Sequence, residues 1–375
     1  MMKIFLTGDN HIGLRYASHS AADTICARRI SAFESMVSAA NAENCGLFVV
    51  AGDLFENTYS ISKRDVRAVL DILSRFNGIV AVLPGNHDYY DSDTKLWQYF
   101  RELMQQYDNI MLLCEQRPYR ITLGDNIVAL YPAPCYALHS APGENNLGWI
   151  KTTDMPHDEV FRIGIAHGAV EGETIDREGA YYLMRREELE SIPVDVWLLG
   201  HTHVPFPGAL REDEYSGGER LFNAGTHVQT DVSCNTDGEC FVLEIAGDRT
   251  VKAKKCITGN LRFNRISVTV YPGELKIRLE DALRGLDDSS VVDVMLSGSV
   301  TAEEYEDRHS VIEDALARFI EGTYDDSGLS RQITQELICA EFPETSLSAG
   351  FLTALLDDPK EAQLGYELLR SLKEK

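Results

Sequence analysis

The stretch Leu83-Pro84-Gly85-Asn86-His87-Asp88 decides how the rest of the chain is interpreted. It ends the apolar run 78–83, which has the composition of a fully buried strand. The Pro-Gly pair terminates that strand and turns the chain. An amide, an imidazole and a carboxylate therefore follow one another at the carboxyl end of a strand, where open α/β sheets bind their ligands.

Four further strand ends carry similar polar side chains. They follow apolar runs at 3–7, 47–51, 161–166 and 194–199, each of which predicts a strand. Glycine flanks most of these positions and lets a ligand approach the backbone closely. Together the five strand ends supply Asp9, His11, Asp53, Asn86, His87, His167, His201 and His203.

The segments between these strands predict an α/β fold. Helical periodicity is expected over residues 22–44, from Ser62 onward and from Asp93 onward, and Asp65 lies at capping-box distance from Ser62. This β-α-β-α-β order predicts a parallel sheet covered by helices. A hairpin is expected over 119–131, and residues 132–158, rich in Pro, Gly and Asn, are typical of a surface excursion. Strands at 220–223, 240–245 and 251–256 are expected to belong to a second sheet.

A domain boundary is predicted near Thr258-Gly259-Asn260. Beyond it, residues 266–270 and 291–296 have the pattern of neighbouring strands, residues 312–320 that of a helix, and the end of the chain is expected to be wholly helical. The chain is therefore divided into a domain of residues 1–258 and a small α/β domain with a helical tail, residues 261–375.

Composition places the chain among soluble globular proteins, with 375 residues, 44% hydrophobic and 25% charged. No apolar run reaches the roughly 20 residues that span a bilayer, and the N-terminus enters a strand at once, without room for a signal peptide. The eight cysteines are scattered without a CxxC pair, which indicates free thiols in a reducing cytoplasm.

The net charge of −24 is unfavourable for an unaided nucleic-acid binder. Neither part of the chain is basic, and residues 261–375 hold 12 Lys and Arg against 23 Asp and Glu. The usual electrostatic footprint of nucleic-acid binding is therefore absent. If the protein acts on DNA, metal ions or a basic partner must supply much of the attraction; otherwise the acidity serves solubility.

Seven of the eight strand-end side chains suit a pair of divalent cations. Carboxylate, amide and imidazole ligands together favour Mn²⁺, Fe or Zn over Ca²⁺ or a thiolate site. Two ions about 3.5–4 Å apart stabilise the attacking and leaving oxygens of a displacement at phosphorus. The other histidines lack a strand-end setting and are expected to be structural, with His227 the nearest to a motif: His19, His139, His157, His227 and His309.

These motifs resemble those of the calcineurin-like metallophosphoesterase superfamily. The resemblance covers roughly residues 1–257 and implies a two-sheet sandwich flanked by helices. Within the superfamily, residues 11–13, 51–55 and 222–226 resemble the SbcD-type DNA double-strand-break repair nucleases, which carry a small α/β capping domain after the phosphoesterase domain. The motifs that carry the resemblance are Gly8-Asp9-x-His11, Gly52-Asp53, Gly85-Asn86-His87-Asp88, His167 and Gly200-His201-x-His203.

The resemblance implies a role for each matching residue. One Mn²⁺ would be bound by Asp9, His11, Asp53 and His203, and the other by Asp53, Asn86, His167 and His201. His87 would not be a ligand and would protonate the leaving oxygen. The implied partners are DNA, a coiled-coil SMC-like ATPase and a second copy of the chain, paired through helices near 62–76 and 93–106. One residue departs from the pattern: Glu56 stands where many relatives have a histidine that orders the substrate end.

Three functions remain open from the sequence. The first is a DNA exonuclease or endonuclease subunit that acts with the ATPase; the second is a phosphatase or small-molecule phosphodiesterase; the third is an inactive scaffold. Residues 52–58 lack the arginine that protein Ser/Thr phosphatases of the superfamily carry there, and cyclic-nucleotide phosphodiesterases usually lack a capping domain. Burying two carboxylates among histidines without metal would be costly, which argues against the scaffold.

A stripe of leucines ends the chain. Leu364, Leu368 and Leu372 follow Pro359 at spacings of four residues, which places them on one helix face. Such a stripe is expected either to dock on a helix of the ATPase or to pack on the protein's own C-terminal domain.

Overall fold

The computed structural model describes residues 1–155, 161–172 and 180–373. Contacts between residues divide the chain into two compact units, Met1–Arg262 and Phe263–Lys375. Part of the expected surface excursion at 132–158, including His157, lies outside the described residues. None of the described helices is long and apolar enough to cross a membrane.

The first sheet of the larger unit is built from β1 (Met2–Thr7), β2 (Leu47–Ala51), β3 (Ile79–Leu83), β4 (Ile110–Leu112), β9 (Ser216–Gly217), β11 (Glu239–Ile245) and β12 (Val251–Ile257). The strand order is β4-β3-β2-β1-β11-β12-β9. β1, β2, β3 and β4 are parallel, as the alternation of strands and helices predicts. This part of the sheet brings three of the polar strand ends to one edge.

Two strands lie in a different sheet from the one expected. β11 pairs antiparallel with β1, with Met2 opposite Ile245 and Leu6 opposite Phe241, and β12 pairs with β11. The assignment of residues 240–245 and 251–256 to the second sheet is therefore wrong. β1 is buried between two neighbours and needs a partner on each edge, but nothing in its sequence identifies which later strand returns to it.

The second sheet contains β5 (Tyr119–Leu123), β6 (Asn126–Ala133), β7 (Phe161–His167), β8 (Val196–Gly200) and β10 (Leu221–Asn223). Its order is β10-β8-β7-β6-β5. β5 and β6 form the predicted hairpin, with Tyr119 opposite Leu130, whereas β6, β7, β8 and β10 are parallel. Two more polar strand ends, those of β7 and β8, therefore point the same way along this sheet.

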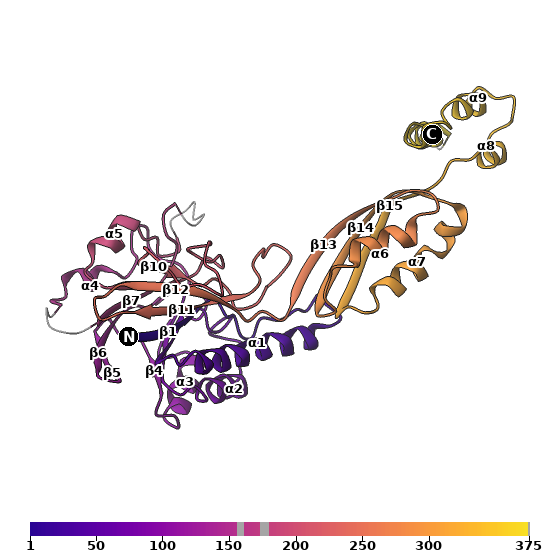
Figure 1. Ribbon diagram of the computed structural model, residues 1–375. Coiled ribbons are helices and arrows are strands. Elements are labelled where there is room, and N and C mark those ends of the chain that lie inside the picture. The colour runs from indigo at the N-terminus through magenta and orange to yellow at the C-terminus, as the bar shows by residue number, and fades with distance from the viewer. Residues whose placement is uncertain (156–160, 173–179, 374–375) are drawn as a thin grey trace. The chain divides into compact units, whose positions relative to one another are not determined.

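Helices cover the outer faces of the sandwich. On the first sheet lie α1 (Ala22–Ala42), α2 (Lys63–Leu73) and α3 (Lys95–Met104), gathered on one side in Figure 1. The predicted capping box at Ser62 and Asp65 starts α2. Alternation along β1 separates two cores, because Phe5 packs under the helices while Ile4 and Leu6 pack between the sheets. On the second sheet lie α4 (Gly148–Thr152) and α5 (Arg186–Ser191), over a third core that contains Trp197.

The smaller unit has one sheet with helices on it and a helical end. Its sheet, β13 (Arg262–Val270), β14 (Ser290–Val300) and β15 (Glu321–Arg331), is in the order β13-β14-β15 and shares a core with α6 (Leu275–Leu283) and α7 (Ala302–Leu316). The helical end consists of α8 (Gln335–Glu341), α9 (Leu347–Ala354) and α10 (Pro359–Lys373). β15 was not expected, because the sequence EGTYDDSGLSR has neither an apolar run nor strict alternation.

Candidate metal centre

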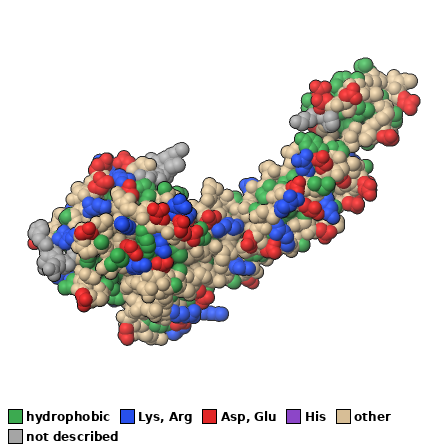
Figure 2. All heavy atoms as spheres, viewed as in Figure 1, with side chains coloured by type: hydrophobic (Ala, Val, Ile, Leu, Met, Phe, Trp, Pro, Cys, Tyr) green, Lys and Arg blue, Asp and Glu red, His purple; other side chains and the backbone are tan. Residues whose placement is uncertain are grey.

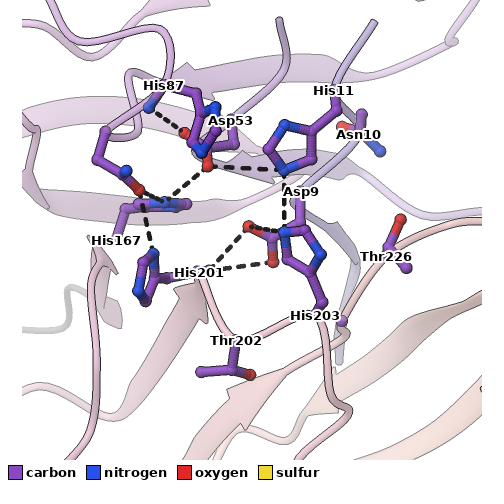
Figure 3. Close-up of polar contacts among 12 residues, drawn as sticks. Asp9, Asn10, His11, Asp53, His87, His167, His201, Thr202, His203 and Thr226 are labelled. Carbon is purple, nitrogen blue, oxygen red and sulfur yellow. Dashed lines mark hydrogen bonds and ion pairs between the residues drawn. The ribbon is translucent and has the colours of Figure 1, made fainter. Parts of the chain in front are cut away.

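The two sheets bring all eight predicted side chains to one place. Asp9 and His11 follow β1, Asp53 follows β2, Asn86 and His87 follow β3, His167 ends β7, and His201 and His203 follow β8. The loops are tied to each other through the main chain, because the Asp9 N–H donates to the Gly52 carbonyl at 3.1 Å and the His11 N–H to the Asp53 carbonyl at 2.9 Å. Figure 3 shows the side chains converging from opposite sheets.

One group of ligand atoms, which we name the first cluster, is formed by Asp9, His11, Asp53 and His203. The Nε2 atoms of His11 and His203 are 2.9 Å apart. Asp53 Oδ2 lies 3.7 Å from His11 Nε2, and Asp9 Oδ1 lies 4.0 Å from His203 Nε2. Ligand atoms about 2.1 Å from a shared ion are separated by roughly 3–4 Å, so these distances fit one cation.

The second cluster is formed by Asp53, Asn86, His167 and His201. Asn86 Oδ1 lies 2.9 Å from His167 Nε2 and 3.0 Å from His201 Nδ1. Asp53 Oδ2 lies 3.2 Å from His167 Nε2. The same carboxylate oxygen of Asp53 therefore borders both clusters, while its Oδ1 accepts a hydrogen bond from the His87 main-chain N–H at 2.8 Å. A carboxylate in this position could contact a cation in each cluster.

The donor set itself favours a cation. The Ala51 carbonyl can only accept, so the 2.8 Å contact to His167 Nδ1 places the hydrogen on that nitrogen. In a neutral imidazole the lone pair is then on Nε2, which faces the oxygens of Asn86 and Asp53. Three acceptors pointing at one another need a proton or a metal ion between them. Carboxylate, amide and imidazole ligands fit Mn²⁺, Fe or Zn.

Burial and charge shift the pKa values within the centre. Burial opposes ionisation of Asp53, but the positive charge of His167, a hydrogen bond to it and the charges of His11 and His87 hold the pKa of this carboxyl below its usual value. Burial also opposes protonation of His167, yet the charge of Asp53 raises its pKa to about 9. Burial lowers the pKa of His201 to about 4 and that of His203 below its ordinary value. The centre therefore holds the ionised carboxylate of Asp53 beside two neutral imidazoles, those of His201 and His203.

The main chain is strained at these positions. Asp9, His11, Asp53, His201 and His203 all have positive φ, from 47° to 107°. Non-glycine residues seldom adopt this conformation, and it concentrates at functional sites. The strain aims the side chains inward from tight turns after the strands.

Two glycines make room for side chains of the centre, Gly85 for Asp53 and Gly52 for His167. A Cβ atom on Gly85 would lie 2.2 Å from Asp53 Oδ1, and one on Gly52, at φ +93°, would lie 2.1 Å from His167 Nδ1. The carboxylate of Asp88 accepts from the Gly85 N–H at 2.7 Å and from the Phe55 N–H at 3.0 Å, so it joins the two loops. Burial and the charge of Asp53 raise the pKa of Asp88 to about 7. Asp88 ends the motif Gly85-Asn86-His87-Asp88, but its place in the sequence predicts no function for it.

His87 lies beside the clusters. Its side chain is 39% exposed, and its ring packs edge-on against His11 with centroids 4.8 Å apart. Nδ1 lies 3.1 Å from the Glu56 carbonyl, which can only accept, so the hydrogen is on Nδ1. The ring also lies close enough to His11 and Asp53 to form part of a cation-binding group with them.

His227 is a structural histidine. It is fully buried, with Nδ1 3.2 Å from Asn10 Nδ2 and Nε2 3.2 Å from the Arg29 carbonyl. Arg29 in turn donates to the Asn10 carbonyl at 2.7 Å. This network supports the loop that carries Asp9 and His11 from behind, because Asn10 lies between them in the chain.

A scan of protein families identifies the chain's class. Residues 2–205 match the family model described as Calcineurin-like phosphoesterase, which is more than half of the chain, and the chain belongs to this family. The family hydrolyses phosphoesters with a dinuclear divalent metal centre, and the structure holds candidate ligand groups for such a centre.

Comparison with solved structures also found matches. The chain is 13% identical to TT1561 of Thermus thermophilus, with a TM-score of 0.42, over 68% of this chain and 99% of that one. It is 13% identical to the purple acid phosphatase PPD1 from yellow lupin (Lupinus luteus) seeds, with a TM-score of 0.39, over 68% of this chain and 51% of that one. No curated protein sequence matches the chain.

Proposed function

We propose that the protein is a Mn²⁺-dependent DNA nuclease subunit that acts with a coiled-coil SMC-like ATPase in the cytoplasm. The observation that carries the hydrolytic part is the position of Asp53 Oδ2 between the two clusters. Two bound ions would activate water and neutralise charge on the phosphoryl group. The eight cysteines are free thiols, which supports a reducing compartment.

The residues around the ions would have two roles, metal binding and proton donation. Asp53 would link the two sites, because it contacts His11 and His167. Asn86 would hold the second site together through His167 and His201 of the opposite sheet. His87, fixed through Nδ1 by the Glu56 carbonyl, would in its protonated form give the proton on Nε2 to the leaving oxygen. Its exposed position beside the clusters is where a phosphodiester would enter.

A cavity next to the centre supports a polymeric substrate. It has a volume of about 370 Å³ and is lined by Ile12 and Gly13, which directly follow His11, and by Arg15 and Arg64. Neither guanidinium has an ion pair or hydrogen bond with any described residue, although the chain carries a charge of −24. Two unpaired arginines in a cavity lined by the residues that follow His11 suit the phosphates of a strand that continues past the cleaved bond.

The leucine stripe of α10 supports the ATPase partnership. Leu364, Leu368 and Leu372 are 68%, 58% and 63% exposed. The opposite side of α10, with Ala362 and Tyr366, is buried against α8 and α9. The stripe therefore does not pack on its own domain, and a helix of the ATPase would cover it. The acidic surface favours a basic partner, which would also supply the attraction to DNA.

A small-molecule phosphodiesterase or phosphatase is the second candidate. It is favoured by the net charge and by the surface in Figure 2, where acidic side chains lie among the basic ones over the face shown. Such a surface does not form the basic track of a protein that binds long DNA.

Hydrolysis of two substrates by the same Mn²⁺-loaded protein separates the candidates. We expect cleavage of both bis-p-nitrophenyl phosphate and linear DNA, with DNA cleavage weak and sensitive to salt. Replacing Arg15 and Arg64 by Ala should lower DNA cleavage and leave the small ester unaffected, with Arg67→Ala, on the same helix as Arg64, as the control. Ester hydrolysis without any DNA cleavage, also with the ATPase present, would favour the second candidate.

A further inference from the structure

The side chain of Glu56 contacts the first cluster without belonging to it. Its Oε2 lies 2.9 Å from His11 Nδ1. A carboxylate can only accept, so this hydrogen bond places the hydrogen of His11 on Nδ1. In a neutral imidazole the lone pair is then on Nε2, the atom that lies 2.9 Å from His203 Nε2 and 3.7 Å from Asp53 Oδ2.

Glu56 is itself firmly placed. Its main-chain N–H donates to the Ile12 carbonyl at 3.0 Å, and its carbonyl accepts from His87 Nδ1 at 3.1 Å. Its side chain is only 27% exposed. The carboxylate is therefore held against His11 by two loops of the centre and is not a solvated surface group.

The two clusters differ in how a histidine is oriented. In the second cluster, His167 Nδ1 is held by a main-chain carbonyl, that of Ala51. In the first cluster, a side chain takes this role for His11. A substitution can remove the partner of His11 without disturbing that of His167. It also leaves the bond from His87 in place, because that bond goes to the main chain of Glu56.

We propose that Glu56 is a positioning residue, whose carboxylate fixes the tautomer and ring orientation of His11 and thereby sets the metal affinity of the first cluster alone. The proposal rests on the dinuclear centre of the proposed function. Outer partners of metal-binding histidines typically contribute about 10–100-fold in metal affinity. The second cluster, oriented by Ala51, should be unaffected.

Manganese binding to the full-length, metal-depleted protein tests this without any substrate. Titrations followed by electron paramagnetic resonance report free Mn²⁺, singly occupied centres and coupled pairs of ions. For Glu56→Ala we expect one affinity to fall by about 10–100-fold, with the other within a few-fold of wild type. Glu56→Gln, whose amide oxygen can accept the same hydrogen bond, should recover most of the loss. The control is Glu102→Ala, which removes an exposed carboxylate on α3.

Several outcomes would overturn the proposal. One is a Glu56→Ala protein that binds both ions as tightly as wild type. Another is a Gln variant as weak as the Ala variant, which would assign the effect to charge and not to orientation. Equal loss at both sites, with a lower unfolding temperature of the metal-depleted protein, would mean a general structural role. If the wild-type chain itself fails to bind two ions, the proposed function fails, which is a different result from any of these.

Discussion

In most folded proteins polar side chains are exposed and apolar ones are buried, and two regions of this molecule depart from that rule in different ways. At the metal centre, polar groups are buried: Asp9, Asp53 and His167 are at most 2% exposed. On α10, apolar groups are exposed, with Leu364, Leu368 and Leu372 more than half accessible. Buried polar and exposed apolar groups are the informative exceptions in a folded protein. The first kind suits small charged ligands inside the fold, and we propose that the second docks on a macromolecular partner.

Removing the shared carboxylate should have the largest effect. Asp53→Ala deletes the oxygen that borders both clusters, so the rate of bis-p-nitrophenyl phosphate hydrolysis in Mn²⁺ should fall by about 10³-fold or more, because the ions supply several kcal/mol to the reaction. Asp65→Ala serves as the matched control, because it removes a carboxylate that only caps the start of α2. Near-native turnover of Asp53→Ala would exclude Asp53 as the carboxylate shared by two metal ions.

Removing His87 should separate chemistry from metal binding. His87→Ala should keep both ions and lose about 10²–10⁴-fold in kcat, the usual range for a general acid. Metal content of the purified variant and its kcat on the same ester decide the matter. A variant that turns over at the wild-type rate would exclude His87 as the acid, and one that loses an ion would make it a ligand.

Changes to the leucine stripe should affect only DNA cleavage in the presence of the ATPase. Addition of the ATPase is expected to raise DNA cleavage strongly, and deletion of residues 359–375 should abolish that stimulation while leaving ester hydrolysis by the chain alone unchanged. Replacing Leu364, Leu368 and Leu372 by Ser should also abolish the stimulation. The fold should be unaffected, because these three side chains are mostly exposed. Stimulation of the truncated protein equal to that of the full chain would exclude docking through α10.

The smallest expected effect is a shift in mass with concentration, caused by weak dimerisation through α2 and α3. Aromatic side chains of α3 would suit an interface, but Trp97 and Phe100 are fully buried in the protein's own core. What remains exposed includes the polar pair Lys63 and Glu102, 2.7 Å apart. We therefore expect a weak homodimer, with light scattering approaching twice 41.9 kDa only as concentration rises. A constant mass of 41.9 kDa at micromolar concentration and above would exclude it.

The sequence predicts the centre better than it predicts the rest of the fold. Asp9, Asp53 and Asn86 each follow an apolar run, and parallel strands of one sheet end at one edge, so their proximity follows from local patterns. That His167 meets them from the other sheet is implied only by the family resemblance. The position of β11 beside β1 does not follow, because strand pairing over such a separation depends on the complete fold. β15 is missed because pairing with β14, and not its own polar sequence, makes it a strand.

Side-chain partners show the same limit. The sequence identifies Glu56 only as a departure from a pattern, since its contact with His11 depends on how two loops pack together. The periodicity of α10 predicts its leucine stripe, but not that Ala362 and Tyr366 would be the side that packs inward. Local patterns therefore predict which residues are unusual, whereas the folded structure determines what they contact.

Counting the bound ions tests the central claim most directly. The claim is that Asp53 joins two metal sites into one centre. After loading with Mn²⁺ and removal of free metal by gel filtration, elemental analysis should find two ions per chain in the wild type and less than one in Asp53→Ala, because both clusters lose a ligand. An Asp53→Ala protein that retains two ions, or a wild-type protein that binds only one, would contradict the account.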